Sequence, residues 1–96
     1  MKKSILIEEV AQKTGIPKKE TEMVINALLD TITDALKNKE AVSFLGFGSF
    51  HPVKKNSREV YIPGTTKKVK IEEKYSIRFK PGKKLKDEIQ KALEED

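Results

Sequence analysis

The chain has 96 residues, of which 36% are hydrophobic and 36% charged, and it carries a net charge of +5 and no cysteine. A chain of this length makes one domain, but its apolar content is low for a core built alone, so association with a second copy is expected. The composition excludes a disulfide framework, a thiolate metal site and a membrane-spanning segment. Acidic residues follow the N-terminus too soon for a secretion signal, which predicts a soluble, intracellular protein.

The positive charge is concentrated in one part of the chain. Residues 1–50 carry seven lysines and seven acidic residues, whereas residues 51–86 carry twelve lysines or arginines and only three glutamates. Residues 87–96 are acidic again, with five acidic residues and one lysine. A basic block of this kind attracts a polyanion, and nucleic acid is favoured, although an anionic membrane face or an acidic protein fits the same charges.

Two amphipathic helices are predicted first along the chain. Ser4 is expected to cap the first helix, which ends before Gly15, and Pro17 suits the start of the second, which runs to about Lys37. The apolar stripe of the second helix is wide enough to contact both the first helix and a partner chain. An ordinary core helix would show a similar stripe, but its width in so small a chain favours dimer packing.

Short strands are expected after the helices. Residues 41–45 are β-branched and aromatic, and Gly46 and Gly48 predict a tight hairpin after them. Strand character resumes over residues 49–55.

Two further strands are expected near the end of the sheet. Polar and apolar residues alternate over 67–71 and again over 75–79, which is typical of half-buried strands. The dipeptide Pro81-Gly82 ends the sheet, and a closing helix begins at Lys83.

Between these strands lies a long basic segment that we interpret as an arm made of two extended strands. Repeated cations on both strands suit the phosphates of a duplex, because each one releases condensed counterions when it docks. Many solvated hairpins are also rich in lysine, so this signal is moderately specific. The cations of the arm are Lys54, Lys55, Arg58, Lys67, Lys68 and Lys70.

The tip of the arm is apolar where solubility alone would favour polar residues. Ile62 and Pro63 stand there, followed by Gly64. Apolar wedges, proline included, enter base steps from the minor groove and kink the duplex. The plainer interpretation is a type II turn, for which Pro-Gly is a common central pair. Both interpretations hold together, because a wedge needs a rigid turn beneath it.

No pattern predicts an enzyme, a metal site or a cofactor. His51 is the single histidine and is interpreted as a residue on the surface of a strand. Three adjacent glutamate pairs, Glu8-Glu9, Glu72-Glu73 and Glu94-Glu95, indicate solvated charge rather than a catalytic dyad. No phosphate-binding glycine-rich loop occurs.

The chain resembles the HU/IHF family of bacterial DNA-bending, nucleoid-associated proteins over essentially its whole length. The matching motifs are Gly46-Phe47-Gly48-Ser49-Phe50, Pro63 at the arm tip, and Phe79-Lys80-Pro81-Gly82-Lys83 with Leu85-Lys86 after it. The segment from Asp30 to Leu36 also looks like the family's second helix. The combination is specific, whereas the Gly-Phe-Gly turn alone would be weak.

The resemblance implies an α+β fold with two N-terminal helices, a β-sheet saddle with a long protruding β-ribbon arm, and a short C-terminal helix. Residues 1–96 would form one domain, with dimerisation helices at about 1–40, saddle and arm at about 41–81, and the last helix at about 83–94. An intertwined homodimer is expected, with a heterodimer with a paralogue as the alternative. The implied dimer core comprises Leu28, Leu29, Ile32, Leu36, Phe44, Phe47, Phe50 and Phe79.

The resemblance and the charge pattern together predict a set of DNA contacts. This set comprises Lys3, Gly46, Ser49, Lys54, Lys55, Arg58, Tyr61, Ile62, Pro63, Lys67, Lys68, Lys70, Arg78, Lys80, Lys83 and Lys86. The tip departs from the family, because Tyr61 and Ile62 replace the usual arginine and asparagine, and Glu59 replaces a common cation. We therefore expect apolar insertion to be kept and hydrogen bonding in the groove to be reduced.

The predicted function is that of a histone-like protein of the cytoplasmic nucleoid, which binds double-stranded DNA as a dimer through the minor groove. It would bend and compact the duplex with low sequence specificity, without a small-molecule substrate or a membrane. A site-selective IHF-type bender is one alternative. A dimeric interaction module whose basic arm binds acidic proteins or RNA is another.

Overall fold

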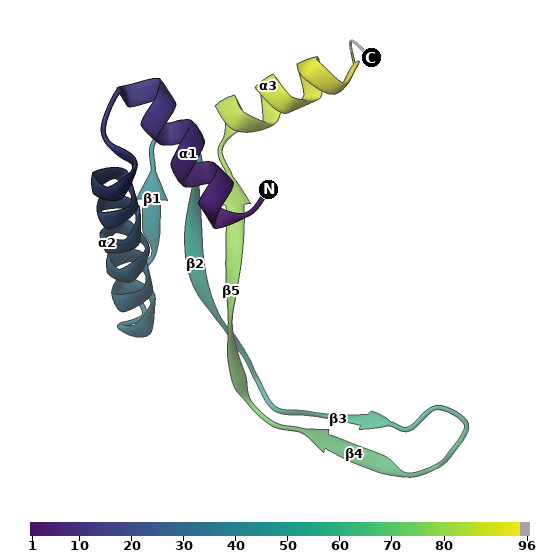
Figure 1. Cartoon of the computed structure of the whole chain (residues 1–96). Helices are drawn as coiled ribbons and strands as arrows, with labels where there is room; N and C mark the ends of the chain where they lie inside the picture. The colour runs from purple at the N-terminus through teal and green to yellow at the C-terminus, as the bar shows by residue number, and fades with distance from the viewer. Residues whose placement is uncertain (95–96) are drawn as a thin grey trace.

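Two helices, an antiparallel sheet with a long arm and a final helix follow one another in a computed structural model that describes residues 1–94 (Figure 1). The predicted α+β fold is confirmed. No helix within the described range is both long and apolar enough to cross a membrane. The elements are α1 (Lys3–Thr14), α2 (Lys18–Lys37), β1 (Val42–Phe44), β2 (Gly48–Lys55), β3 (Arg58–Tyr61), β4 (Lys68–Ile71), β5 (Lys74–Pro81) and α3 (Lys83–Glu94).

The ends of the first helix follow the sequence signals only in part. Gly15 adopts a left-handed conformation with φ 74°, and its N–H donates to the Ala11 carbonyl at 2.9 Å, as expected of a helix-ending glycine. The prediction that Ser4 caps α1 is wrong. The helix begins earlier because the extended Lys2 is the capping residue, and its carbonyl accepts the N–H of Leu6 at 3.1 Å.

The two N-terminal helices pack against each other through a small contact. Ile7 of α1 is 4% exposed and Thr21 of α2 is 3% exposed. The Thr21 hydroxyl donates to the Pro17 carbonyl at 3.0 Å, which satisfies its buried oxygen. An exposed ion pair between Lys18 and Glu8, at 2.9 Å, joins the helices at their surface. Exposed pairs add little stability, so Ile7 is the main anchor of this contact.

One antiparallel register runs from the sheet to the tip of the arm. Strands β2 and β5 pair from Gly48↔Pro81 to Lys55↔Lys74, and β3 and β4 pair from Arg58↔Ile71 to Tyr61↔Lys68. Two residues separate the ladders on each side, so neither strand carries an insertion. The ribbon bends between the ladders, which turns the arm away from the sheet (Figure 1). Strand β1 pairs with the other side of β2.

Alternation along these strands gives the sheet two chemically different faces. Residues paired in register share a face, so the assignment follows directly from the pairing. We call them the apolar face and the polar face. The apolar face carries Val42, Phe44, Phe50, Pro52, Lys54, Tyr75, Ile77 and Phe79. The polar face carries Ser43, Ser49, His51, Val53, Lys55, Lys74, Ser76, Arg78 and Lys80.

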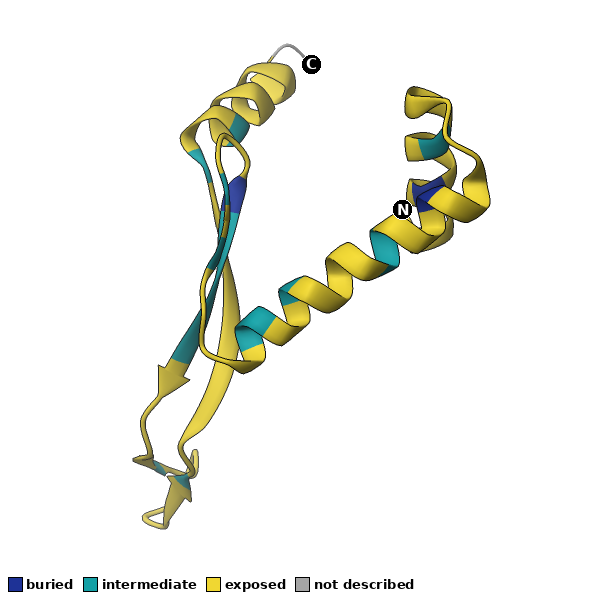
Figure 2. Ribbon diagram, turned by 90° about the vertical axis from the view of Figure 1, so that its left-hand side faces the viewer, coloured by how far each residue is buried: buried dark blue, intermediate teal, exposed yellow. Residues whose placement is uncertain are grey.

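A single chain does not enclose a core. Ile7 is the only buried hydrophobic side chain among residues 1–94, and most of the molecule is exposed (Figure 2). Phe47 is 50% exposed, Ile77 52% and Leu28 47%. The radius of gyration is 19.5 Å, whereas a compact domain of this length has about 12 Å. Much of the apolar face and of α2 is therefore left uncovered by residues 1–94 of the same chain.

Gly48 occupies a position that has no room for a side chain. A Cβ there would lie 2.7 Å from the Lys80 carbonyl oxygen and 2.7 Å from the Phe79 ring. We expect Gly48→Ala to reduce the free energy of unfolding by about 3 kcal/mol, since the ladder must shift to relieve the overlap. Urea unfolding at one fixed protein concentration measures this loss.

Gly46→Ala is the matched control for that substitution. A Cβ on Gly46 would meet only the flexible Lys84 side chain, at 3.8 Å, so the expected loss is about 1 kcal/mol from its φ of 83°. Equal losses for the two variants would contradict the close approach at Gly48.

Candidate nucleic-acid interface

The glycine turn between β1 and β2 is fastened to the start of α3. The Phe47 N–H donates to the Phe44 carbonyl at 2.9 Å, and the Phe47 carbonyl accepts the Gly82 N–H at 2.8 Å. Gly46, with φ 83°, needs the conformational freedom of glycine. These bonds bring four predicted DNA contacts to one shallow hollow. Its lining residues include Gly46, Ser49, Lys80 and Lys83.

The polar face gathers several predicted contacts side by side. Ser49 pairs with Lys80, and Lys55 pairs with Lys74, while Arg78 lies between the two lysines on β5. Sequence reasoning did not select Lys74, although the alternation of polar and apolar residues from position 74 to 80 places it with Arg78 and Lys80. The face thus presents a row of four cations, Lys55, Lys74, Arg78 and Lys80.

Lys54 is separated from that row. The register places it on the apolar face, opposite Tyr75. Its ammonium lies 3.2 Å from a carboxylate oxygen of Glu73. Lys54 and Lys55 are neighbours in sequence, but successive strand residues point to opposite faces, so they do not act on the same surface.

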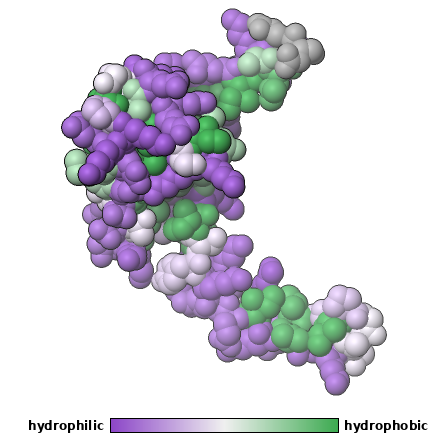
Figure 3. Space-filling model, viewed as in Figure 1, coloured by the Kyte–Doolittle hydropathy of each residue, from purple (hydrophilic) through white to green (hydrophobic). Residues whose placement is uncertain are grey.

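The arm also has two different sides. Its apolar residues share one side, where they form an apolar patch (Figure 3). That side carries Arg58, Val60, Ile62, Lys67, Val69 and Ile71. The opposite side carries Glu59, Tyr61, Lys68 and Lys70. The arm cations predicted from sequence are therefore divided between the two sides.

Lys68 has two partners within the arm. Its ammonium lies 3.9 Å from a carboxylate oxygen of Glu59 and 5.4 Å from the centre of the Tyr61 ring. Both contacts come from the residues that depart from the family pattern. They hold Lys68 close to the ribbon, on the side away from the apolar patch.

The tip is a hydrogen-bonded turn. The Ile62 carbonyl accepts the Thr65 N–H at 3.0 Å and the Thr65 hydroxyl at 3.0 Å, while the Ile62 N–H donates to the Lys67 carbonyl at 3.0 Å. Gly64 has φ 79°, which distinguishes a type II turn from type I. The predicted turn is confirmed, and it holds Pro63 exposed at the far end of the molecule.

The flanking lysines lie in the first turns of helices. Lys3 begins α1, whereas Lys83 and Lys86 lie in the first turn of α3, and neither turn carries an acidic residue. Cations near a helix N-terminus oppose the helix dipole, typically by less than about 1 kcal/mol each. An anionic ligand bound there would remove this repulsion.

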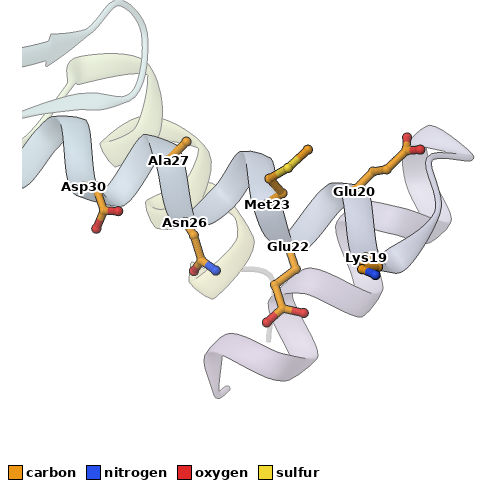
Figure 4. Close-up of a pocket in the computed structure, with 7 residues that line it drawn as sticks. All are labelled: Lys19, Glu20, Glu22, Met23, Asn26, Ala27 and Asp30. Carbon is orange, nitrogen blue, oxygen red and sulfur yellow. The ribbon is translucent and has the colours of Figure 1, made fainter.

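Another surface hollow lies along α2 (Figure 4). Met23 and Ala27 project from one side of the helix, and the other side carries Glu22 and Asp30. Three carboxylates against one lysine make it unsuited to nucleic acid. Within residues 1–94, no cluster of histidine and acidic side chains is arranged to hold a metal ion.

Comparisons with known proteins agree with this geometry. The family model for bacterial DNA-binding proteins matches residues 1–90. DNA-binding protein HU of Thermus thermophilus is 42% identical over 89 residues, which is 93% of this chain and 92% of that protein. HU of Thermotoga maritima is also 42% identical, over 93% of this chain and 99% of its own.

Solved structures of similar shape include HU proteins. The cocrystal structure of Anabaena HU with DNA superposes with a TM-score of 0.81 at 32% identity, covering 93% of this chain and 97% of that one. The V42I mutant of Thermotoga maritima HU gives a TM-score of 0.66 at 36% identity, covering 93% and 99%. With helices, sheet, arm and matching motifs in place, the chain belongs to the bacterial DNA-binding protein family that includes the HU proteins.

Proposed function

We propose that the protein binds double-stranded DNA as a homodimer, through the minor groove and with little sequence specificity, and that it bends and compacts the duplex. The observation that carries this proposal is the continuous ribbon. It joins a row of cations on the polar face to an arm that ends in an exposed proline. In a bacterial cell, such a protein acts in the cytoplasm as part of the nucleoid.

The dimer is supported by the apolar surface that one chain leaves open. Phe79 remains 39% exposed and Leu29 44% exposed, although both belong to the predicted dimer core. The rest of that core is also half-buried or exposed, so a second copy is the natural cover. Burial of these side chains contributes about 1.5–3 kcal/mol each, which a chain this small needs in order to fold.

Affinity in this proposal comes mainly from cations that replace counterions on phosphates. A dimer would present two polar faces and two arms. With about six to ten phosphate contacts, binding should weaken by about three to five orders of magnitude between low and moderate salt.

Low specificity follows from the chemistry of the tip. Ile62 and Pro63 have no side-chain hydrogen-bonding group, and the Tyr61 ring stacks against Lys68 on the opposite side of the arm. Sequence is read mainly by hydrogen bonds to base edges, so this tip supplies little direct readout. A wedge of this kind instead favours steps that are easily kinked.

A fluorescence energy transfer titration tests the proposal. A duplex of about 35 base pairs, labelled at both ends, is titrated with protein at low and moderate salt. Transfer that rises on binding, with affinity falling steeply in salt, is the expected result. Binding without a change in transfer would contradict bending. If single-stranded RNA or anionic vesicles displaced the duplex at equal concentration, the preference for duplex DNA would fail.

A further inference from the structure

His51 lies in a hydrogen-bonded pair on the polar face. Its Nε2 is 2.6 Å from the hydroxyl oxygen of Ser49, which precedes it by two residues on β2 and so shares its face. Both side chains are half-buried. Sequence reasoning treated His51 as a plain strand residue, but this contact joins it to a predicted DNA contact.

The charged neighbours of this pair on the sheet are cations. On β5, Arg78 lies opposite His51 and Lys80 lies opposite Ser49; on β1, Ser43 lies opposite Ser49. The polar faces of the three strands carry no carboxylate.

The helix that approaches the sheet lies on its other side. Residues of α2 line a hollow together with Val42 and Phe44 of the apolar face, and Glu40 is the acidic residue that borders this hollow. Glu40 thus lies beside α2 and the edge strand β1, whereas His51 lies on the polar face of β2.

Protonation changes what the pair offers to an outside ligand. A neutral imidazole has one ring nitrogen that accepts and one that donates. The neutral pair therefore offers an outside ligand a single donor, which is the His51 Nδ1–H when the Ser49 hydroxyl donates to Nε2. In the imidazolium form both ring nitrogens donate. Nε2–H then donates to the Ser49 oxygen, and the hydroxyl hydrogen is released. The charged pair therefore offers two donors, the Ser49 O–H and the His51 Nδ1–H.

We propose that Ser49 and His51 together bind a DNA phosphate on the polar face, and that this contact is coupled to proton uptake by His51. The inference rests on the proposed function. A phosphate held among Arg78, Lys80 and this pair places negative charge beside the imidazole, which favours the charged form. Because the coupling is reciprocal, acidification strengthens DNA binding by the same factor.

Two substitutions bracket the charge of His51 without removing a polar side chain. His51→Gln can never be charged, and His51→Lys is charged at every pH of the experiment. Affinity for a rhodamine-labelled duplex of about 35 base pairs is measured by anisotropy between about pH 5.5 and about pH 8, the range in which histidine changes charge, at constant ionic strength.

The wild type is expected to follow His51→Gln at the high-pH end and to approach His51→Lys at the low-pH end. On acidification, the affinity of the wild type for the duplex should rise about tenfold more than that of His51→Gln. The slope of log affinity against log salt concentration should also steepen by about one for each His51 that contacts a phosphate. Ser49→Ala should show a smaller gain in DNA affinity on acidification, because the hydroxyl donor is absent. Thermal melts at both pH values establish that each variant is folded.

Several results would overturn the coupling. If wild type and His51→Gln bound DNA with parallel pH profiles, His51 would not take up a proton, while the proposed function would stand. An unchanged gain in Ser49→Ala would show that His51 acts without its partner. If none of the proteins bound the duplex at any pH, the proposed function and the coupling would both fail. If His51→Gln does not fold, the comparison of wild type with His51→Lys still tests the coupling. Affinities of these two proteins that failed to converge at low pH would contradict it.

Discussion

Replacing Phe79 with alanine is expected to unfold the protein at micromolar concentration. The Phe79 ring centre lies 4.9 Å from that of Phe50 and 5.7 Å from that of Phe47, and Phe44 continues the cluster at 6.5 Å from Phe47. Removing a core phenylalanine costs about 3–5 kcal/mol. A symmetric dimer loses this twice, which approaches the whole stability of about 5–15 kcal/mol that is typical of a domain.

Melting curves at several protein concentrations measure this effect, with sedimentation to report the mass. For the wild type, the midpoint should rise with concentration, because folding and dimerisation are linked. Tyr61→Ala is the matched control, since it truncates an aromatic ring that is 62% exposed on the arm and should leave the midpoint unchanged. A Phe79→Ala protein that melted like the wild type, with the same concentration dependence, would exclude this cluster from the dimer core.

The helices were predictable because their signals are local. The apolar stripe of α2 and the glycine at position 15 depend on near neighbours in sequence, and α2 spans the expected Lys18–Lys37. Ser4 misled because Lys2, two residues earlier, already adopts the extended capping conformation, which places Ser4 inside the first turn of the helix. The choice between Lys2 and Ser4 depends on the path of the chain before the helix, which the sequence pattern does not specify.

The faces of the ribbon were less predictable, because they depend on register. Sequence reasoning grouped Lys54 with Lys55 by strand, whereas pairing places them on opposite faces. The alternation of side chains between the two faces of a strand could have assigned Lys54 and Lys55 to opposite faces. The same alternation could not have shown that the ribbon continues through Glu72 and Glu73 without an insertion, because no apolar residue there marks which face is which. The Ser49–His51 contact was accessible as a same-face pair two residues apart, but its distance required the structure.

Replacing Pro63 with alanine is expected to abolish most of the DNA bend while leaving most of the affinity. The cations of the arm and of the polar face supply the counterion term, and none of them is changed. Proline fills a base step as a rigid apolar wedge, and the small alanine side chain cannot hold the step apart. The turn should persist, because Gly64 supplies the φ of 79° and Thr65 keeps both of its bonds to the Ile62 carbonyl.

The measurement is energy transfer across the labelled duplex at saturating protein, so that any loss of affinity does not imitate a loss of bending. Thr66→Ala, at the exposed residue that follows the Ile62–Thr65 turn, is the matched control and should bend DNA like the wild type. Ile62→Ser should give an intermediate bend, since Ile62 is 39% exposed beside the wedge and shares the apolar side of the arm.

If the energy transfer across the duplex were as high with Pro63→Ala as with the wild type, the proline would be only a turn residue. The bend would then have to come from phosphate neutralisation on the polar face, which predicts that it weakens with salt in parallel with binding. A wedge makes the opposite prediction, because an inserted side chain holds the kink for as long as the complex exists. Transfer at saturation, compared at two salt concentrations, therefore separates the two origins of bending even if both contribute to the affinity.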